Sequence, residues 1–432
     1  MKQNLAIALL SVIFFAQGAF GGEMEVFNLK NGVKVLFNKT NGVKVAAMRI
    51  YTPVSVISEN PQNAGISYIT AKLMTRSTKN RSSEILAKDI DDIGASLSCD
   101  ADYDYAGFCM TFLSEYFDKA AEILSDVLIN PAFDAKEIAS EKKDIDAAFK
   151  SNKDSIFLTA LHKFIKLSYA DAPYSNPVIG KPETVEAVTE QNLKDWHKHS
   201  YNASNILISV SGNVNAKTVK KSLEKYFGKI ESGEKFVKPE FETGIKKSLK
   251  TVEKGKFNQA YIFTGFEAPR LSDKDFAALK VASAVLGGRM TSRLFIELRE
   301  KLGLAYETSA IYPSRAADSF FAVYIGLDKK NIDLTLKRID EILKDFCSKE
   351  IDEQELKDVK TYIKGMYIMD RQTVSKTSYY YAWREITGQG YKYDDEYLND
   401  VEKVTTKDIY DVANKIFKQN SVTVVIDPTD NR

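Results

Sequence analysis

The sequence is poor in the residues that build metal centres and disulfide frameworks, with three histidines and three cysteines among 432 residues. The spacings of Cys99, Cys109 and Cys347 match no zinc-ligand pattern. An excess of charge is also lacking, because 60 basic residues face 59 acidic ones. Dedicated binders of nucleic acid or of anionic membranes normally carry a basic excess, so the composition argues against both classes.

Proline is scarce, with ten residues in the chain, and no low-complexity tract is present. With 44% hydrophobic and 28% charged residues, the composition is that of a globular protein. The length exceeds what one ordinary core accommodates and favours two or more domains. Beyond the N-terminal segment, no apolar run is long enough to span a bilayer.

The N-terminus has the three parts of a secretory signal peptide. Lys2 is positively charged, residues 5–16 are apolar, and residues 16–22 offer small side chains to a signal peptidase. We expect a signal peptide over 1–21 and an exported, periplasmic mature protein with no integral membrane span. An uncleaved membrane anchor is the alternative, although the apolar stretch is shorter than the ~20 residues of a spanning helix.

An exported protein can form disulfides. Cys99 and Cys109 lie symmetrically about Asp104, so they would face each other if 95–113 is a hairpin that turns there. A Cys99–Cys109 disulfide is therefore possible. The alternative is two small buried hydrophobic residues.

The chain repeats itself once at long range. Three segments of the first half resemble three segments of the second: 185–214 resembles 401–428, 133–149 resembles 351–367, and 89–103 resembles 297–312. The three pairs occur in the same order in both halves. A tandem duplication is the best account of matches that stay in register.

Each half contains an apolar strand, two helices of which the second ends at a glycine, a strand pair, further helices and a closing strand. This order predicts an α+β fold of two homologous domains, each a mainly antiparallel sheet with helices packed on one face. We place the N-terminal domain at 22–230 and the C-terminal domain at 245–432. The polar segment 231–244 contains glycine and proline and is the predicted linker.

Four stretches carry a family resemblance: "NGVKVLFNKTNGVKVAAMRIYTPVS", residues 77–145, "GKPETVEAVTEQNLKDWHKHSYNASNILISVSGNV" and "VLGGRMTSRLFIELREKLGLAYETSA". The first, third and fourth are similar to the opening hairpin, the segment that closes the first domain, and the C-terminal run of the insulinase-like and mitochondrial-processing-peptidase-like zinc peptidases of the pitrilysin superfamily. Residues 77–145 follow the family pattern closely, including the glycine after the second helix. The resemblance covers essentially the whole mature chain. It implies that the two domains form half of a clam-like chamber.

Active members of that family carry an inverted zinc motif, H-x-x-E-H, on the first helix of the first domain. The two histidines share one helix face and bind zinc, and the glutamate activates the zinc-bound water. A distant second glutamate completes the ligand set. Here the resemblance places Tyr68 and Lys72 at the histidine positions, Ala71 at the glutamate position and Ala148 at the distant glutamate.

None of these four residues suits zinc. A tyrosine with its ordinary pKa of about 10 is protonated at neutral pH, a lysine is a cation, and alanine has no donor atom. The same helix keeps its core stripe of Ile66, Ile69 and Leu73. The pattern predicts a retained scaffold without metal ligands, so we expect no zinc or other cofactor in this chain.

The histidines do not suggest another zinc site. His197 and His199 are two apart on a predicted helix and therefore point in different directions, and His162 lies far from both in sequence. We expect a solvated or capping role for them.

The second half retains Arg299 and Tyr306, a pair that the resemblance places in the substrate chamber. A guanidinium and a phenol can both donate hydrogen bonds to a carbonyl oxygen on which negative charge develops. Taken by themselves, the two residues are typical of a solvated helix arginine and a core tyrosine. Gly287 and Gly288 either let backbone approach a peptide or form a turn between helices.

The resemblance thus implies a non-catalytic subunit of a heteromeric, exported zinc metallopeptidase, inactive alone. A homologous partner would hold the zinc and the general base. This chain would contribute Arg299, Tyr306 and half the chamber around a peptide substrate. The alternative is a structural or peptide-binding envelope protein with no proteolytic role. An autonomous peptidase with unusual chemistry is the third hypothesis, and the loss of all four family positions weighs against it.

Overall fold

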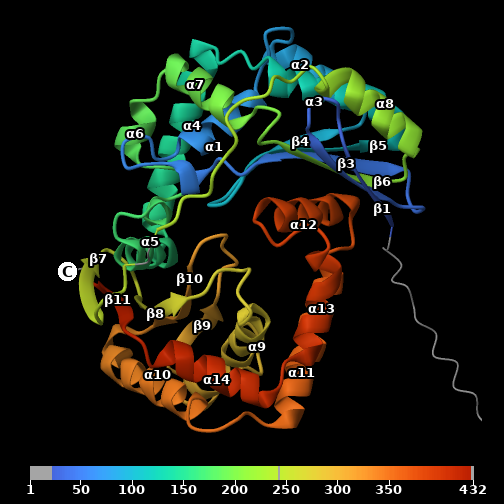
Figure 1. The fold of residues 1–432 in the computed structure, drawn as a ribbon. Coiled ribbons are helices and arrows are strands. Elements are labelled where there is room, and N and C mark those ends of the chain that lie inside the picture. The colour runs from blue at the N-terminus through green and yellow to red at the C-terminus, as the bar shows by residue number, and fades with distance from the viewer. Residues whose placement is uncertain (1–21, 242–243, 430–432) are drawn as a thin grey trace, which may run out of the picture.

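The computed structural model describes residues 22–241 and 244–429, so the predicted signal peptide lies outside the described residues. The chain forms two halves, each built on one sheet with helices on its outer side (Figure 1). The predicted α+β fold with two homologous domains is confirmed. Within 22–241 and 244–429, no helix has the length and apolarity needed to cross a membrane.

The N-terminal half carries a six-stranded sheet in the order β1-β2-β6-β3-β5-β4. Its strands are β1 (Glu23–Asn28), β2 (Lys34–Lys39), β3 (Val45–Thr52), β4 (Ser96–Ala101), β5 (Ala106–Leu113) and β6 (Leu207–Gly212). Its helices are η1 (Val56–Ser58), α1 (Ile66–Met74), α2 (Ser83–Asp91), η2 (Ser114–Tyr116), α3 (Phe117–Ile129), α4 (Ala135–Asp154), α5 (Ile156–Tyr169), η3 (Pro173–Ser175), α6 (Pro182–Glu186), α7 (Glu190–Ser200) and α8 (Ala216–Phe227).

The C-terminal half carries a five-stranded sheet in the order β7-β11-β8-β10-β9. Its strands are β7 (Leu249–Gly255), β8 (Ala260–Ala268), β9 (Ala305–Ile311), β10 (Ser319–Leu327) and β11 (Ser421–Pro428). Its helices are α9 (Phe276–Leu286), η4 (Phe295–Lys301), η5 (Lys329–Asn331), α10 (Ile332–Phe346), α11 (Glu353–Met369), α12 (Val374–Ile386), α13 (Tyr393–Lys403) and α14 (Thr406–Phe417).

The two sheets have the same topology. In each, one pair of strands is parallel, β2 with β6 and β7 with β11, and the following strands are antiparallel. Gly94 after α2 and Gly303 after η4 both adopt left-handed backbone, with φ of 59° and 60°. Glycine tolerates this conformation without a steric penalty, which explains why both helices stop there. The N-terminal sheet has one additional edge strand, β1.

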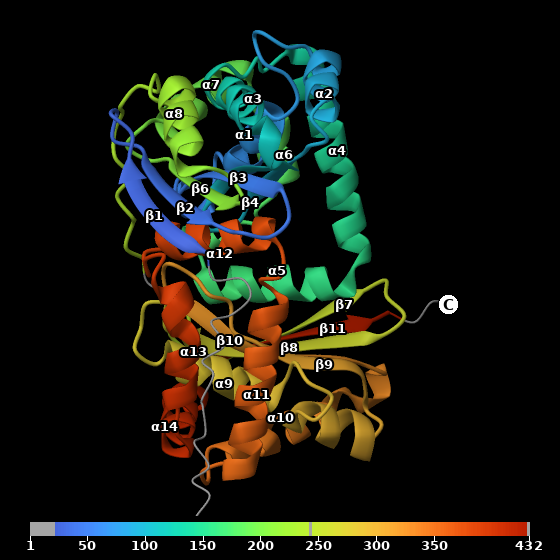
Figure 2. The same cartoon turned by 90° about the vertical axis from the view of Figure 1, so that its right-hand side faces the viewer.

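The halves exchange equivalent helices, which the prediction of helices on one face did not include. Helix α5 of the N-terminal half packs on β8 and β11, while α12 of the C-terminal half packs on β3 and β6. Figures 1 and 2 show both helices between the two sheets. Phe164 of α5 is fully buried and contacts the rings of Phe263 and Phe320. The inner face of each sheet is therefore covered by a helix from the opposite half.

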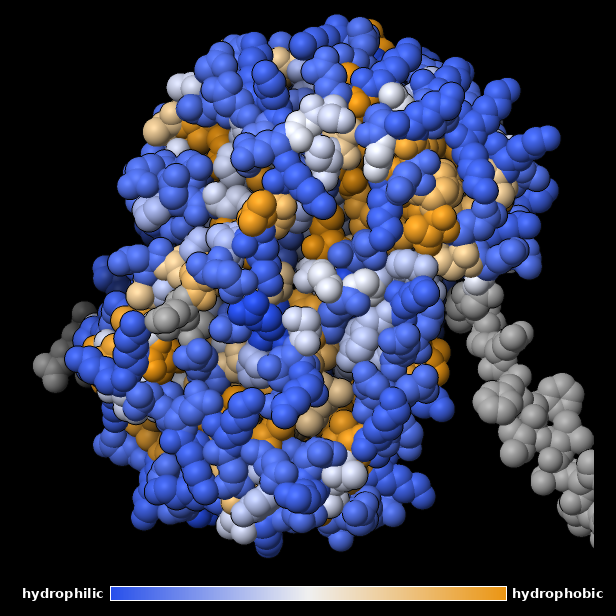
Figure 3. Space-filling view, in the orientation of Figure 1, coloured by the Kyte–Doolittle hydropathy of each residue, from blue (hydrophilic) through white to orange (hydrophobic). Residues whose placement is uncertain are grey.

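Polar contacts reinforce this junction. Arg49 on β3 bonds to Asp100 and Tyr51 and donates to the backbone oxygen of Ser375 on α12 at 3.3 Å. Arg315 of the C-terminal half pairs with Asp102 at 2.9 Å. In the space-filling view, hydrophilic side chains dominate the surface and hydrophobic patches show around the junction (Figure 3). The junction is thus both apolar and specifically hydrogen-bonded.

Candidate functional site

Helix α1 is built into the N-terminal core as its sequence pattern predicts. Ile66, Ile69 and Leu73 are buried among the core residues. Tyr68 and Lys72, four residues apart, are half-buried on a different face, and the Lys72 Nζ lies 5.7 Å from the centre of the Tyr68 ring. The structure therefore brings together the two side chains at the predicted histidine positions.

Their contact is a cation–π pair. Burial raises the pKa of Tyr68, and the Lys72 ammonium opposes this only in part. The phenol is therefore protonated at neutral pH and offers no anionic oxygen. Ala71 is fully buried on α1, and Ala148 is half-buried on α4, which packs against α1.

Sequence reasoning missed Glu141, a buried carboxylate on α4. It accepts hydrogen bonds from Arg76 Nε at 3.1 Å and Nη2 at 2.8 Å. Burial has the largest effect on the pKa of Tyr68 and of Cys99 and raises both. The charge of Glu141 raises the two pKa values further. Positions 141 and 148 are seven residues apart and share one face of α4. This helical spacing was the signal in the sequence that could have placed Glu141 near the predicted site.

These residues do not fit a zinc ion. Two of the four aligned positions have no donor atom, one holds a cation, and one holds a protonated phenol. The buried carboxylate of α4, Glu141, is already paired with Arg76. In the described part of the chain, no three His, Cys, Asp or Glu side chains are grouped so that they could hold a metal ion.

A second buried carboxylate, Glu59, holds the start of α1. It accepts hydrogen bonds from the backbone N–H of Gly65 at 2.9 Å, the backbone N–H of Ser67 at 3.0 Å, and the Ser67 hydroxyl. Gly65 has a φ of 92°, and its Cα lies against Gly180 so closely that a side chain would collide. Burial raises the pKa of Glu59 to about 7, because its hydrogen bonds compensate only in part.

This carboxyl predicts a pH dependence of stability. The folded state holds the proton more tightly than the unfolded state, so the stabilisation is present below an unfolded pKa of about 4.5 and is lost as the pH rises through about 7. We expect the stability difference between wild type and Glu59→Gln to change by on the order of 3 kcal/mol between these limits. Urea unfolding of both proteins across that range measures it, and parallel pH curves would contradict the prediction.

The structure contradicts the Cys99–Cys109 disulfide, one of the two interpretations of these cysteines. The β4–β5 hairpin pairs Cys99 with Phe108 and Ser98 with Cys109, one residue away from the register that symmetry about Asp104 requires. A shift of one residue places the two side chains on opposite faces of the sheet. All three cysteines are free thiols, and the Cys109 sulfur lies 3.8 Å from the Ser375 hydroxyl.

The three histidines lie in three different environments. His197 on α7 contacts the backbone oxygen of Leu128 through Nε2 at 2.7 Å, and burial lowers its pKa. His199 is exposed, with its ring 6.2 Å from that of Trp196. His162 on α5 is half-buried, and burial lowers its pKa as well.

Arg299 and Tyr306 are both exposed, and both lie at irregularities of the backbone. Arg299 is on the π-helix η4, where its guanidinium carbon lies 5.0 Å from the Phe295 ring centre. Tyr306 is 60% exposed, and β9 pairs Glu307 with Gly326 but Ala305 with Leu327, so Tyr306 is the extra residue of a β-bulge. Among described residues, neither side chain has a hydrogen bond or an ion pair. π-Helical segments and β-bulges are frequent at functional sites.

Gly287 and Gly288 have structural reasons to be glycine. A side chain at Gly287 would collide with the backbone of Ala310 on β9. Gly288 has a φ of 79°, and its N–H donates to the Ser309 hydroxyl at 2.8 Å. The loop after α9 is therefore held against β9, in agreement with the turn interpretation. Whether the glycines also contact a peptide stays a prediction.

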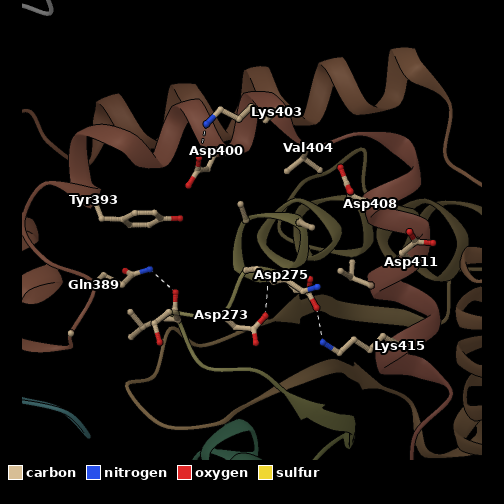
Figure 4. Close-up of a pocket in the computed structure, with 17 residues that line it drawn as sticks. Asp273, Asp275, Gln389, Tyr393, Asp400, Lys403, Val404, Asp408, Asp411 and Lys415 are labelled. Carbon is tan, nitrogen blue, oxygen red and sulfur yellow. Dashed lines mark hydrogen bonds and ion pairs between the residues drawn. The ribbon is translucent and has the colours of Figure 1, made fainter.

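A pocket of about 990 Å³ opens elsewhere on the C-terminal half, between α9, α13 and α14 (Figure 4). Its charged side chains are largely paired: Lys415 with Asp275 at 2.6 Å and Lys403 with Asp400 at 3.1 Å. None of the predicted site residues lines it. The candidate site and this pocket are therefore separate features.

The duplicated sheets, the exchanged helices and the α1–α4 pair define a protein of two homologous α+β domains. Residues 34–181 match the family model described as insulinase (peptidase family M16), and residues 187–363 match the one described as peptidase M16 inactive domain. Together these ranges cover more than half of the chain. The chain therefore belongs to peptidase family M16 of the pitrilysin superfamily, which confirms the resemblance seen in the sequence.

Relatives match over almost the whole chain. A protein from Rickettsia felis described as an uncharacterized zinc protease is 28% identical, over 94% of this chain and 98% of its own length. YmxG from Bacillus subtilis, also described as an uncharacterized zinc protease, is 24% identical over the same shares. A Helicobacter pylori protein named non-peptidase homolog YmxG is 24% identical over 99% of this chain and 98% of its own length.

Solved structures share the fold. A protease from Helicobacter pylori superposes with a TM-score of 0.88 at 21% identity, covering 94% of this chain and all of that one. A peptidase M16 inactive domain from Pseudomonas fluorescens gives a TM-score of 0.88 at 19% identity, with 94% and 98% covered. At these identities the likeness concerns the fold.

Proposed function

We propose that this chain is the non-catalytic subunit of an exported, heteromeric zinc metallopeptidase. The observation that carries the proposal is that α1 and α4 keep their packing while presenting Tyr68, Ala71, Lys72 and Ala148 where the resemblance expects a zinc site. Membership of family M16 and a Helicobacter pylori relative named as a non-peptidase support the same conclusion.

In this proposal the two chains supply different groups to the active site. A homologous partner with an intact H-x-x-E-H motif supplies the zinc and the general base. This chain supplies half the chamber and the exposed donors Arg299 and Tyr306, which hold the carbonyl of a bound peptide. The apolar N-terminal segment directs the chain to the periplasm. No step of the hydrolysis uses a metal held by this chain.

Reconstitution tests the proposal. We expect the purified mature chain to contain no zinc and to cleave no peptide, whereas its complex with a zinc-motif homologue from the same cells holds about one zinc and cleaves unfolded peptides. A native pull-down of the tagged chain, with metal analysis and a peptide assay of the eluate, measures this. Recovery in an unrelated envelope assembly without peptidase activity would favour the structural alternative.

A further inference from the structure

The C-terminal half has an open groove where the N-terminal half has a packed helix. In the N-terminal half, α8 packs along α3 across the outer side of the sheet (Figure 1) and buries Val219, Leu223 and Phe227. In the C-terminal half, α10 corresponds to α3, and β7 and β11 correspond to β2 and β6. The structure describes one residue, Thr429, after β11, and no helix of the described chain takes the place of α8.

The uncovered surface has an apolar stripe beside charged side chains, because Asp340, Lys344 and Lys418 also line the groove. Phe37 and Val252 are the fourth residues of the equivalent strands β2 and β7, and both face the helix side, paired with Val210 and Val425. Phe37 is completely buried, whereas Val252 is 54% exposed. Beside it lies a groove of about 560 Å³. The side chains that line it on α10, the strands and the end of α14 include Leu336, Ile339, Leu343, Phe417, Phe266 and Thr423.

A charged group also lacks the partner that its counterpart has. Asp118, the second residue of α3, accepts hydrogen bonds from the Ser222 hydroxyl at 2.6 Å and the Tyr226 hydroxyl at 2.9 Å, both on α8. Asp333 is the second residue of α10 and is exposed, and among the described residues no hydrogen bond or ion pair involves its carboxylate. Both halves of the duplication thus carry the acceptor, and only one carries the donors.

We propose that this groove is the docking site for an amphipathic helix of another protein chain. The helix presents apolar side chains four apart to Leu336, Ile339 and Leu343, and places hydroxyl or ammonium donors against Asp333. The internal homology points to an amphipathic helix as the occupant, because α8 fills the equivalent surface with such a stripe and such donors. The proposal does not depend on the peptidase role of the chain.

The probe is a fluorescent peptide of residues 214–230, VNAKTVKKSLEKYFGKI, which carries the sequence of α8. Titrated with the full mature chain, it should bind saturably at micromolar concentrations. Asp333→Asn should weaken binding about tenfold, because a hydrogen-bonded charge is lost. Leu336→Glu, at a half-buried position in the groove, should abolish binding. The matched control is Asp118→Asn, whose carboxylate α8 already occupies, and it should leave binding unchanged.

Thiol protection gives a second readout. Cys347 lines the groove, so bound peptide should slow its alkylation several-fold, while Cys99, distant on β4, should react at the same rate. Thermal unfolding followed by circular dichroism checks that each variant is folded. Absence of saturable binding, equal affinity of wild type and Asp333→Asn, or unprotected Cys347 overturns the proposal. Binding of a dodecyl detergent in the groove without binding of the peptide also overturns the proposal.

Discussion

Replacing Arg299 by alanine together with Tyr306 by phenylalanine will lower the peptidase activity of the reconstituted complex by about 100- to 1,000-fold. This is the loss that follows when hydrogen-bond donors to a developing oxyanion are removed. Both side chains are exposed, and among the described residues neither has a polar partner, so the free energy of unfolding should change little. The effect should fall on kcat as well as on kcat/KM, because the donors are used most fully in the transition state.

The measurement is steady-state cleavage of a quenched fluorescent peptide by wild-type and variant complexes at equal zinc content. Lys301→Ala is the matched control, since it removes an exposed cation two residues further along η4, whose one ion pair among the described residues is with Glu297. Its complex should keep full activity. Equal activity of the Arg299/Tyr306 double variant and wild type would make the pair a relic and favour the structural alternative.

Replacing Phe164 by alanine will destabilise the chain by about 3–5 kcal/mol, the usual effect of truncating a buried phenylalanine. The Phe164 ring is fully buried, lies 5.8 Å from the Phe263 ring and 5.0 Å from the Phe320 ring, and covers Gly265 closely. Because α5 belongs to one half and these residues to the other, the cavity should also weaken the coupling between halves. We expect a single unfolding transition in wild type and two in the variant.

Denaturant unfolding followed by circular dichroism and by tryptophan fluorescence tests this. Trp196 on α7 reports on the N-terminal half, whereas Trp383 on α12 packs against the N-terminal sheet and reports on the junction between the halves. Ile85→Ala on α2 is the control: this side chain is 50% exposed, so the change should cost less than about 0.5 kcal/mol. A loss below about 1 kcal/mol for Phe164→Ala would show that the exchanged helices do not hold the halves together.

Local pattern was sufficient for much of the fold. The apolar stripe of α1 predicted a helix packed in the core, and Ile66, Ile69 and Leu73 are buried there. The glycines after the second helix of each half predicted helix stops, and Gly94 and Gly303 adopt the left-handed conformation. These predictions concern residues close in sequence, where periodicity and backbone preference act directly.

Predictions that needed distant partners were weaker. The β4–β5 register differs by one residue from the symmetric hairpin, and that single step separates Cys99 from Cys109. Glu141 could be placed near Tyr68 only once α4 was packed against α1. The close approach of Gly287 to Ala310 likewise depends on how the loop meets a strand formed later in the chain.

The sequence by itself determined the duplication, the family, and the chemical character of the residues at the lost zinc positions, because identity and spacing along the chain carry that information. Only the tertiary structure decided that α5 and α12 exchange places between the halves, that Tyr306 lies on a bulge, and that the surface beside α10 is open. The physical reason is that the residue pattern of an amphipathic helix or strand shows only that one of its faces must be covered. Which surface covers it is set by the packing of the whole chain.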